Sequence, residues 1–438
     1  MREKRQRLLD RFVRVQDTFD ALCAPLTPEE HRIQPITEAS PPWWSVMHTG
    51  WFYARNILRE LGDYGELDRR YDTLLNSYYH ALGPYLEQGI RGRLSEPAND
   101  RAYAYRASVR GRMERLIATI GDKEIDRLAF LLEIGANHEE QHMELLLTEV
   151  KRIEAEMPFA ELRRPYRAAL PGAPAENPGK AAFIPFAGGE YQFGNLEGGW
   201  CWDNELAVHR HHLRDFALMN RLVTNGDYLE FIGDGGYADC RLWLSTAYDA
   251  FVKKGVVRSP LYWENRDGEW WHWTLAGMRR VDPVEPVCHV NFYEAHAFAL
   301  WKSRTDARFR GVRLPTEREW EHAARSSGAA VGGNLMESGR YHPAATAEPS
   351  PGALAQMVGD VWVWTLNHYE PYPGYTPLPG GLAEYNAKFM NNQRVLRGGS
   401  CATPRGHMRL SYRNFWPPLT QFQFTGIRLA MDLGSEGA

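Results

Sequence analysis

The sequence is poor in cysteine. Its 438 residues contain only five, none of them in a CxxC pair: Cys23, Cys201, Cys240, Cys288 and Cys401. An odd number of scattered thiols argues against both a disulfide framework and a cysteine zinc site. We therefore expect a reducing compartment, the cytoplasm, as the location of the protein.

The sequence also lacks long apolar runs and an excess of one charge. No run reaches the roughly 18–20 apolar residues that cross a bilayer, and the charged N-terminal segment lacks the apolar stretch of a secretory signal. Lysine and arginine number 51 against 55 aspartates and glutamates, a formal charge of −4. This balance gives no reason to bind nucleic acid or an anionic membrane. Phosphate-binding glycine motifs are absent as well.

Tryptophan is scarce in the first part of the chain: of 15 tryptophans, only Trp43, Trp44 and Trp51 precede residue 180. The chain is also about twice as long as a large single core, so two or three domains are expected. Apolar residues at three- and four-residue spacing predict helices over 4–23, 42–61, 68–82, 100–119 and 123–157. Such helices with short connections predict a four-helix bundle.

Short strands, turns and many glycines follow, interrupted by two helical stretches at 224–232 and 292–303. Between the two parts lies a stretch rich in proline, which is typical of a semi-rigid linker. The predicted organisation is a helical bundle (1–162), a linker (163–180) and a strand-rich domain (181–438).

The sharpest local motif is His-Glu-Glu-Gln-His at 138–142 in the last predicted helix. Residues i and i+4 project from one helix face, so His138 and His142 suit one metal ion. The pattern also matches the HExxH motif of zinc hydrolases, in which Glu139 is the general base and Glu161 has the spacing of a third ligand. Packed core histidines are the remaining interpretation.

A third histidine, His48, lies on the inward face of the predicted helix 42–61 with Trp44 and Trp51. Metal sites in bundles are assembled from side chains on facing helices, so His48, His138 and His142 form a candidate ligand set. Three neutral imidazoles accept zinc, iron, nickel or copper, and the residues alone leave the metal open.

Longer motifs add a family resemblance. The segments PPWWSVMHTGWFYARNIL, NSYYHALGP and NHEEQHMELLLTEVK resemble the DinB-like domain of ergothioneine-biosynthetic sulfoxide synthases. VRLPTEREWEHAAR, GDVWVWT and VLRGGSCATPRGHMRLSYRNFW are similar to the formylglycine-generating-enzyme-type sulfatase-modifying-factor domain, whose fold is related to C-type lectins. The resemblance implies an α+β multidomain protein, a DinB-like four-helix bundle followed by a C-type-lectin-like domain.

The resemblance also implies the activity: a non-heme iron(II) enzyme that uses O2 to join a thiol to C2 of N-α-trimethylhistidine (hercynine) as a sulfoxide. His48, His138 and His142 would hold the iron. One departure stands out, because Cys401 has no nearby partner cysteine. The copper–cysteine chemistry of formylglycine-generating enzymes is therefore not expected, and Cys401 is expected to be a small buried hydrophobe.

Reduction of dioxygen consumes protons, so a hydroxyl donor is expected near the iron. Tyr78 and Tyr79 are the candidates, with Tyr369 and Tyr372 as rivals in the second domain. Gln141 lies within the HxxxH turn and is expected to hydrogen-bond the substrate imidazole.

A trimethylammonium group has no N–H to donate, which favours recognition by aromatic faces and oxygen dipoles. Asn414, Phe415 and Trp416 occupy the place where the family contacts this cation. For the thiol, Arg91 offers one guanidinium, and residues 414–424 carry no charge, so cysteine is favoured over γ-glutamylcysteine. Alternatives left open are the zinc hydrolase, a DinB-like thiol transferase without oxygen chemistry, and a lectin-like binding protein.

Overall fold

The computed structural model describes residues 2–62, 64, 70–157, 159–171, 177–255 and 257–434. Residues 172–176 of the predicted linker and 68–69 of the predicted third helix therefore lie outside the described residues. The chain divides into two compact units, one of residues 1–168 with 379–385 and one of 169–378 with 386–438. No helix among the described residues combines the length and the apolar content needed to cross a membrane.

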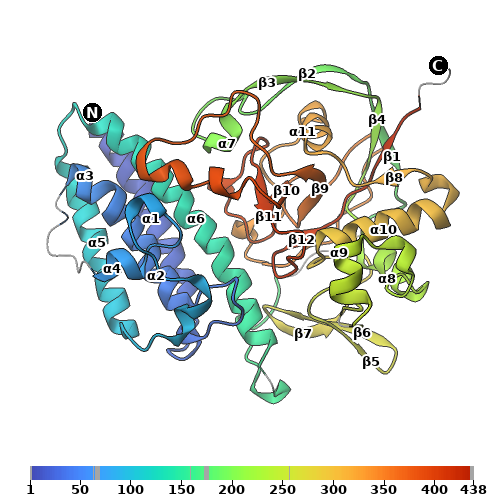
Figure 1. Cartoon of the computed structure of the whole chain (residues 1–438), viewed down its shortest axis with the longest axis horizontal. Helices are drawn as coiled ribbons and strands as arrows, with labels where there is room; N and C mark the ends of the chain where they lie inside the picture. The colour runs from blue at the N-terminus through green and yellow to red at the C-terminus, as the bar shows by residue number, and fades with distance from the viewer. Residues whose placement is uncertain are drawn as a thin grey trace. The chain divides into compact units, whose positions relative to one another are not determined.

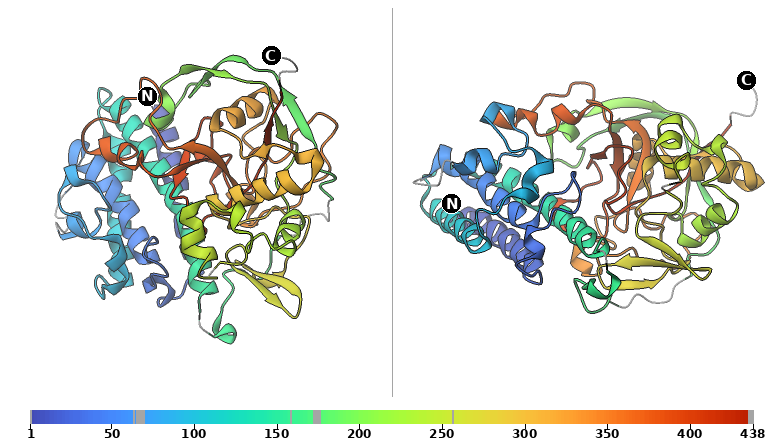
Figure 2. Two further views of the ribbon diagram at one scale, coloured as in Figure 1. Left: turned by 45° about the vertical axis from the view of Figure 1, so that its right-hand side comes forward. Right: turned by 60° about the horizontal axis from the view of Figure 1, so that its bottom comes forward.

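The first unit is a bundle of four long helices, which lie side by side in both views of Figure 2. They are α1 (Arg2–Cys23), α2 (Pro42–Tyr53), α5 (Asn99–Thr119) and α6 (Ile125–Ala155). A π-helical turn, η2 (Ala54–Leu58), and α3 (Arg59–Leu61) extend α2. Pro42 starts α2 at a position where a missing N–H costs nothing. Gly135 lets α2 approach α6, because a Cβ there would lie 2.5 Å from the Tyr53 ring.

Short elements complete this unit: η1 (Glu30–Arg32), α4 (Arg70–Leu74), η3 (His80–Leu82), η4 (Gln88–Arg93), η5 (Ala160–Leu162) and η10 (Gly380–Glu384). The predicted helix over 68–82 was wrong beyond Leu74. The side chain of Asn76 explains the break, because its Oδ1 accepts the Tyr79 N–H at 2.9 Å and its Nδ2 donates to the Tyr79 carbonyl at 2.9 Å. Such side-chain bonds compete with helical ones.

The second unit contains two four-stranded sheets (Figure 1). The first has the order β1 (Phe183–Phe186), β4 (Phe216–Met219), β13 (Ala430–Asp432), β8 (Val312–Arg313), with antiparallel pairs throughout. The second has the order β11 (Asn414–Trp416), β10 (Arg394–Arg397), β9 (Trp362–His368), β12 (Thr425–Gly426), and only β12 pairs in parallel.

Two smaller antiparallel sheets join β2 (Gly189–Phe193) to β3 (His209–Leu213), and β5 (Trp263–Arg266), β6 (Glu269–Thr274) and β7 (Gly277–Arg280) to one another. The helices of this unit are α7 (Asp203–Leu206), α8 (Asn225–Gly233), α9 (Ser245–Ala247), α10 (Phe292–Thr305) and α11 (Glu317–Ser326). Short turns are η6 (Cys240–Leu242), η7 (Tyr248–Val252), η8 (Ala307–Phe309), η9 (Met336–Ser338), η11 (Ala387–Phe389) and η12 (Arg405–His407). The predicted α+β class is confirmed, and α8 and α10 match the two expected helical stretches.

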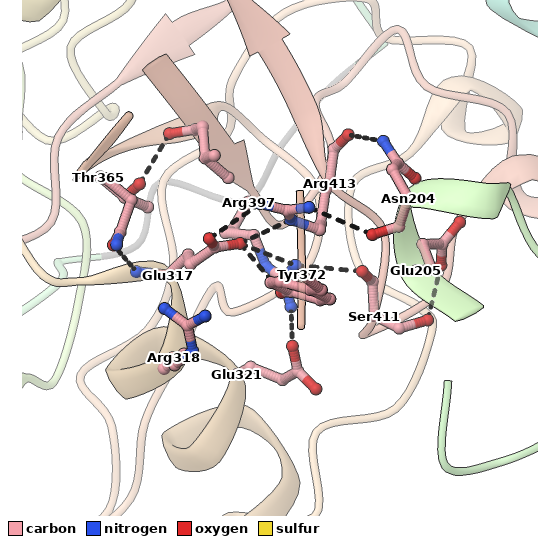
Figure 3. A network of polar contacts seen from close by, with 12 residues as sticks. Asn204, Glu205, Glu317, Arg318, Glu321, Thr365, Tyr372, Arg397, Ser411 and Arg413 are labelled. Atoms are coloured by element: carbon pink, nitrogen blue, oxygen red, sulfur yellow. Dashed lines mark hydrogen bonds and ion pairs between the residues drawn. The ribbon is translucent and has the colours of Figure 1, made fainter. Parts of the chain in front are cut away.

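A buried network of charged groups connects α11 to the second sheet (Figure 3). Arg413, which precedes β11, donates to both carboxylate oxygens of Glu317 at 2.8 and 3.0 Å. The Tyr372 hydroxyl donates to the same carboxylate at 3.0 Å. Arg397 of β10 pairs with Glu321 one helical turn further along α11. Arg325, one turn beyond Glu321 on α11, also donates to the Glu321 carboxylate at 3.1 Å, so each of the two buried carboxylates has at least one guanidinium partner.

The interior of the bundle also contains a charged hub, which joins all four long helices. Arg106 of α5 donates to Glu139 of α6 at 2.6 Å, to Asp20 of α1 at 2.6 Å and to the Thr49 hydroxyl of α2 at 2.9 Å. The Gln16 side chain of α1 donates to Glu139 at 2.6 Å. A guanidinium this deeply buried requires such partners, because an unpaired buried charge is strongly destabilising.

Replacing Arg106 by Ala should therefore lower the free energy of unfolding by about 3–5 kcal/mol, since Glu139 keeps its buried charge with only the neutral Gln16 amide as a partner. Urea unfolding followed by far-ultraviolet circular dichroism measures this loss. Arg110→Ala is the matched control on the same helix, because Arg110 pairs with the exposed Asp17 and should cost at most about 1 kcal/mol. Equal losses in the two variants would contradict a special role for the hub.

Candidate metal centre

Three histidines from two helices meet inside the bundle. His48 comes from α2, and His138 and His142 come from successive turns of α6. The Nε2 atoms of His48 and His138 lie 3.1 Å apart, and one ring nitrogen from each of the three residues lies within 4.8 Å of the others. The i, i+4 spacing on α6 and the inward face of α2 thus bring together the three residues predicted as ligands.

Neighbouring groups fix the orientation of these rings. His48 Nδ1 donates to the Leu75 carbonyl at 2.6 Å, which leaves Nε2 as the nitrogen with a lone pair toward the cluster. Leu75 follows α4, so the helix break described above supplies this acceptor. The indole of Trp44 stacks on His48 at 4.3 Å, and Phe52 stacks on His138 at 3.9 Å. Such second contacts orient metal-binding imidazoles.

The three imidazoles are neutral. Burial lowers the pKa of all three, and the charge of a neighbouring imidazole lowers those of His48 and His138 further, to well below the usual value. For His142, burial and then the charge of Arg91 lower the pKa to about 3. Neutral nitrogen lone pairs that converge in this way fit a divalent transition metal. The Nδ1 atoms of His138 and His142 are buried and have no hydrogen-bond partner among the described residues.

Glu139, the general base of the zinc-hydrolase alternative, does not face the cluster. Its carboxylate is fully buried and accepts from Arg106 and Gln16 at 2.6 Å each. Glu161, considered as a third ligand, is exposed in η5. The group that converges among the described residues contains histidines alone, so the geometry does not support an HExxH hydrolase.

The candidate tyrosines Tyr78 and Tyr79 belong to the same unit, and the Tyr79 ring lies 6.4 Å from that of Phe52, which stacks on His138. Tyr79 is fully buried, and its hydroxyl donates to that of Tyr78 at 3.4 Å. Burial first, and then the neighbouring Tyr78 and Tyr385, raises the pKa of Tyr79 well above its usual value, so its hydroxyl stays protonated. The rivals Tyr369 and Tyr372 are buried in the second unit, where their hydroxyls bond to Asn204 and Glu317.

Sequence reasoning missed Tyr385. This residue belongs to the 379–385 segment of the first unit, and its ring lies 6.0 Å from that of His138. Its hydroxyl donates to the Gln141 side chain. The neighbouring Glu384 accepts the backbone N–H groups of His80 and Ala81 at 3.1 and 2.7 Å, which anchors the segment beside η3. No periodicity or spacing in the sequence signals this placement.

Arg91 is a buried cation next to the cluster. Its guanidinium lies 3.6 Å over the Trp44 ring and donates to the Ser40 hydroxyl at 2.8 Å. Glu149, also missed, is buried two turns beyond His142 on α6 and accepts the Ser40 N–H at 3.0 Å. Burial raises the pKa of Glu149 to about 8. Arg91 contacts no carboxylate within 4 Å among the described residues.

The remaining predicted site residues belong to the second unit. Asn414, Phe415 and Trp416 form β11, and Phe415 stacks on Tyr369 at 4.1 Å. The Asn414 side chain accepts the Phe415 N–H at 2.8 Å. Their contact with a substrate cation stays a prediction. Cys401 is fully buried, as expected of a small core residue.

The fold and the histidine cluster correspond to known families. Residues 11–146 match the DinB superfamily, and residues 169–433 match the sulfatase-modifying factor enzyme 1-like domain. The chain is therefore a two-domain protein that joins these two modules.

Full-length relatives narrow this class. The chain is 31% identical to the hercynine oxygenase of Mycolicibacterium smegmatis over 425 residues, which cover 90% of this chain and 91% of the relative. The corresponding protein of Mycobacterium tuberculosis is 30% identical over 418 residues, 90% of this chain and 91% of that protein. The formylglycine-generating enzyme of Streptomyces coelicolor is 30% identical, but over only 54% of this chain and 83% of that enzyme. The chain belongs to the hercynine oxygenase family.

Replacing His48, His138 or His142 by Ala should abolish stoichiometric binding of iron(II), because two imidazoles alone do not complete the ligand set. Equilibrium dialysis under nitrogen, followed by metal analysis, measures the amount of iron(II) bound per chain.

His31→Ala is the control, since His31 is a buried histidine of the same unit that bonds to Tyr103. It should leave iron binding unchanged. Full iron occupancy in His48→Ala would refute the assignment of ligands.

Proposed function

We propose that this protein is an iron(II)-dependent sulfoxide synthase that uses O2 to join a thiol to C2 of N-α-trimethylhistidine (hercynine) in ergothioneine biosynthesis. The observation that carries the proposal is the cluster of three neutral imidazoles in a chain that aligns along 90% of its length with hercynine oxygenases. The reaction balances: a thiol, the imidazole C2–H and O2 give a C–S bond with one oxygen on sulfur, and one water.

The histidines His48, His138 and His142 would hold the iron, and a set of only three protein ligands would leave coordination positions for the reactants. When bound, the iron supplies the site at which O2 is reduced. The residues of the chain then bind and orient the two organic substrates, which gives the proximity that a free encounter in water lacks. Gln141 is proposed to hydrogen-bond the substrate imidazole, and its contact with Tyr385 holds its amide in one orientation.

Proton supply is proposed to come from the hydroxyls of Tyr78 and Tyr79. Both stand in the turn before η3, and the Tyr79 hydroxyl remains protonated because of its burial. Tyr385 is the alternative donor, since its ring lies near His138. The second-unit residues Asn414 and Phe415, with Trp416, are proposed to accept the trimethylammonium group through an amide oxygen and aromatic faces.

The thiol donor is proposed to be cysteine. Arg91 offers one guanidinium for one carboxylate, and Glu149 offers one carboxyl group for one ammonium. Free cysteine carries one of each, whereas γ-glutamylcysteine carries a second carboxylate and has its cysteine nitrogen acylated. Ser40, which precedes α2, accepts from Arg91 through its hydroxyl and donates to Glu149 through its N–H, so the two groups lie close to each other.

Removing the hydroxyls of Tyr78 and Tyr79 by a double Tyr→Phe change should slow sulfoxide formation about 100-fold or more. It should also divert O2 consumption toward oxidation of the thiol, while iron binding stays intact. Product analysis together with oxygen uptake measures both effects. Tyr103→Phe removes a hydroxyl that bonds to His31, outside the cluster, and should change neither. An unchanged rate and product ratio in the double variant would assign the donor role to Tyr385 instead.

Cysteine should show a higher kcat/KM than γ-glutamylcysteine. Arg91→Met should raise the KM for cysteine about 10- to 100-fold, because a charge-assisted hydrogen bond is lost. Arg91→Lys should give a KM for cysteine between those of the unchanged protein and Arg91→Met, since lysine keeps the positive charge but lacks the planar guanidinium. Steady-state kinetics with the two thiols measures kcat/KM for each. A clear preference for γ-glutamylcysteine would contradict the proposal that cysteine is the thiol donor.

A further inference from the structure

The second unit contains a separate cluster of ligand-type side chains. His272 lies on β6, Glu285 lies between β7 and α10, and His342 follows η9. All three are at most 5% exposed. One donor atom from each lies within 4.8 Å of the others, and His342 Nε2 lies 3.1 Å from the Glu285 carboxylate. The two imidazole rings meet edge to face at 5.1 Å.

A small cavity adjoins this cluster. Its volume of about 10 Å³ suits one water molecule or one ion. Both imidazoles line it, together with Cys288 and His289. Donor groups and a space of this size therefore occur at the same place.

The surrounding charges are compatible with a cation. Glu285 also accepts from Arg279 at 3.0 Å and from Arg340 at 2.7 Å, and both guanidiniums oppose a metal ion. The Asp282 carboxylate lies 3.9 Å from Arg279, and Asp360 interacts electrostatically with Arg340. These two carboxylates partly offset the positive charge of the two guanidiniums. Burial raises the pKa of Glu285, but the charges of His342 and Arg279 outweigh it and hold the pKa at about 2.

We propose that His272, Glu285 and His342 bind one zinc ion in the second unit, independently of the three-histidine centre. Two imidazoles and one carboxylate are a ligand set that zinc accepts, with bonds of about 2.0–2.2 Å. Such bonds place the donors about 3.3 Å apart, so the side chains need to move by about 1–1.5 Å or less. Zinc would replace the proton between His342 Nε2 and Glu285, and a water molecule in the cavity would complete the tetrahedron.

The ion would tie three segments that lack extensive sheet pairing to one another: the β5–β7 hairpins, the loop before α10 and the loop after η9. Its expected role is structural, since the donors are buried and the cavity has no room for an organic substrate. Zinc binding should accordingly raise the unfolding temperature of the second unit.

The test measures zinc stoichiometry in the full-length chain after chelation and dialysis against zinc alone. A His48→Ala/His138→Ala variant removes the first centre and should retain one equivalent. Adding His272→Ala and His342→Ala should remove it. Loss of zinc binding already in the first variant, or retention of one equivalent in the fourfold variant, would overturn the proposal.

Circular dichroism checks that each variant is folded. If the fourfold variant unfolds, the single change His272→Gln replaces His272→Ala and His342→Ala in the His48→Ala/His138→Ala background. Glutamine keeps a polar side chain of similar reach. His322→Ala, a half-buried histidine of the same unit that packs on Tyr191, is the matched control and should retain zinc. Cobalt(II) in place of zinc should give the strong visible bands of four-coordinate cobalt, and these should vanish in His272→Gln. A cobalt spectrum unchanged by His272→Gln would contradict the assignment.

Discussion

The arrangement of the first unit depends on one buried ion pair, Arg106 with Glu139. The guanidinium contacts α1, α2 and α6 from its place on α5, so it fixes the axial position of each helix against the others. Thr49 and Glu139 directly follow His48 and His138 in the chain. The hub is therefore one residue away from two of the three imidazoles, and the register that satisfies the buried charge is also the register that brings those rings together. Stability and site geometry have a common cause here.

The same constraint decides what the HxxxH helix can do. Because Glu139 is committed to Arg106, it is not available as a base, and the cluster is left with neutral nitrogen donors only. Trp44 and Phe52 cover His48 and His138 with aromatic faces, which keeps water away and the imidazoles uncharged. A site of this kind can hold a redox metal without a protein carboxylate. The charged side chain beside the cluster is that of Arg91, which is proposed to bind the carboxylate of the thiol substrate.

The sequence predicted the parts of this site that depend on local spacing. His138 and His142 follow from the i, i+4 rule, and His48 from the inward face of its helix. The contacts between residues far apart in the chain could not be predicted from the sequence. Tyr385 bonds to Gln141, which is 244 residues away. No sequence pattern pairs Arg106 with Glu139 among 51 basic and 55 acidic residues. The helix expected over 68–82 ends early because the Asn76 side chain competes with the backbone. Periodicity does not register such a competition.

The second unit shows why two buried charged clusters of similar size differ in what they can bind. Its strands are short, from two residues in β8 to seven in β9, so side-chain networks carry much of the connection between loops. Around Glu317 the carboxylates face guanidiniums, which have no lone pairs to offer a cation (Figure 3). Around Glu285 two imidazoles complete the set, and an imidazole gives up its proton far more readily than a guanidinium. Only the second arrangement can exchange a proton for a metal ion without losing its partners.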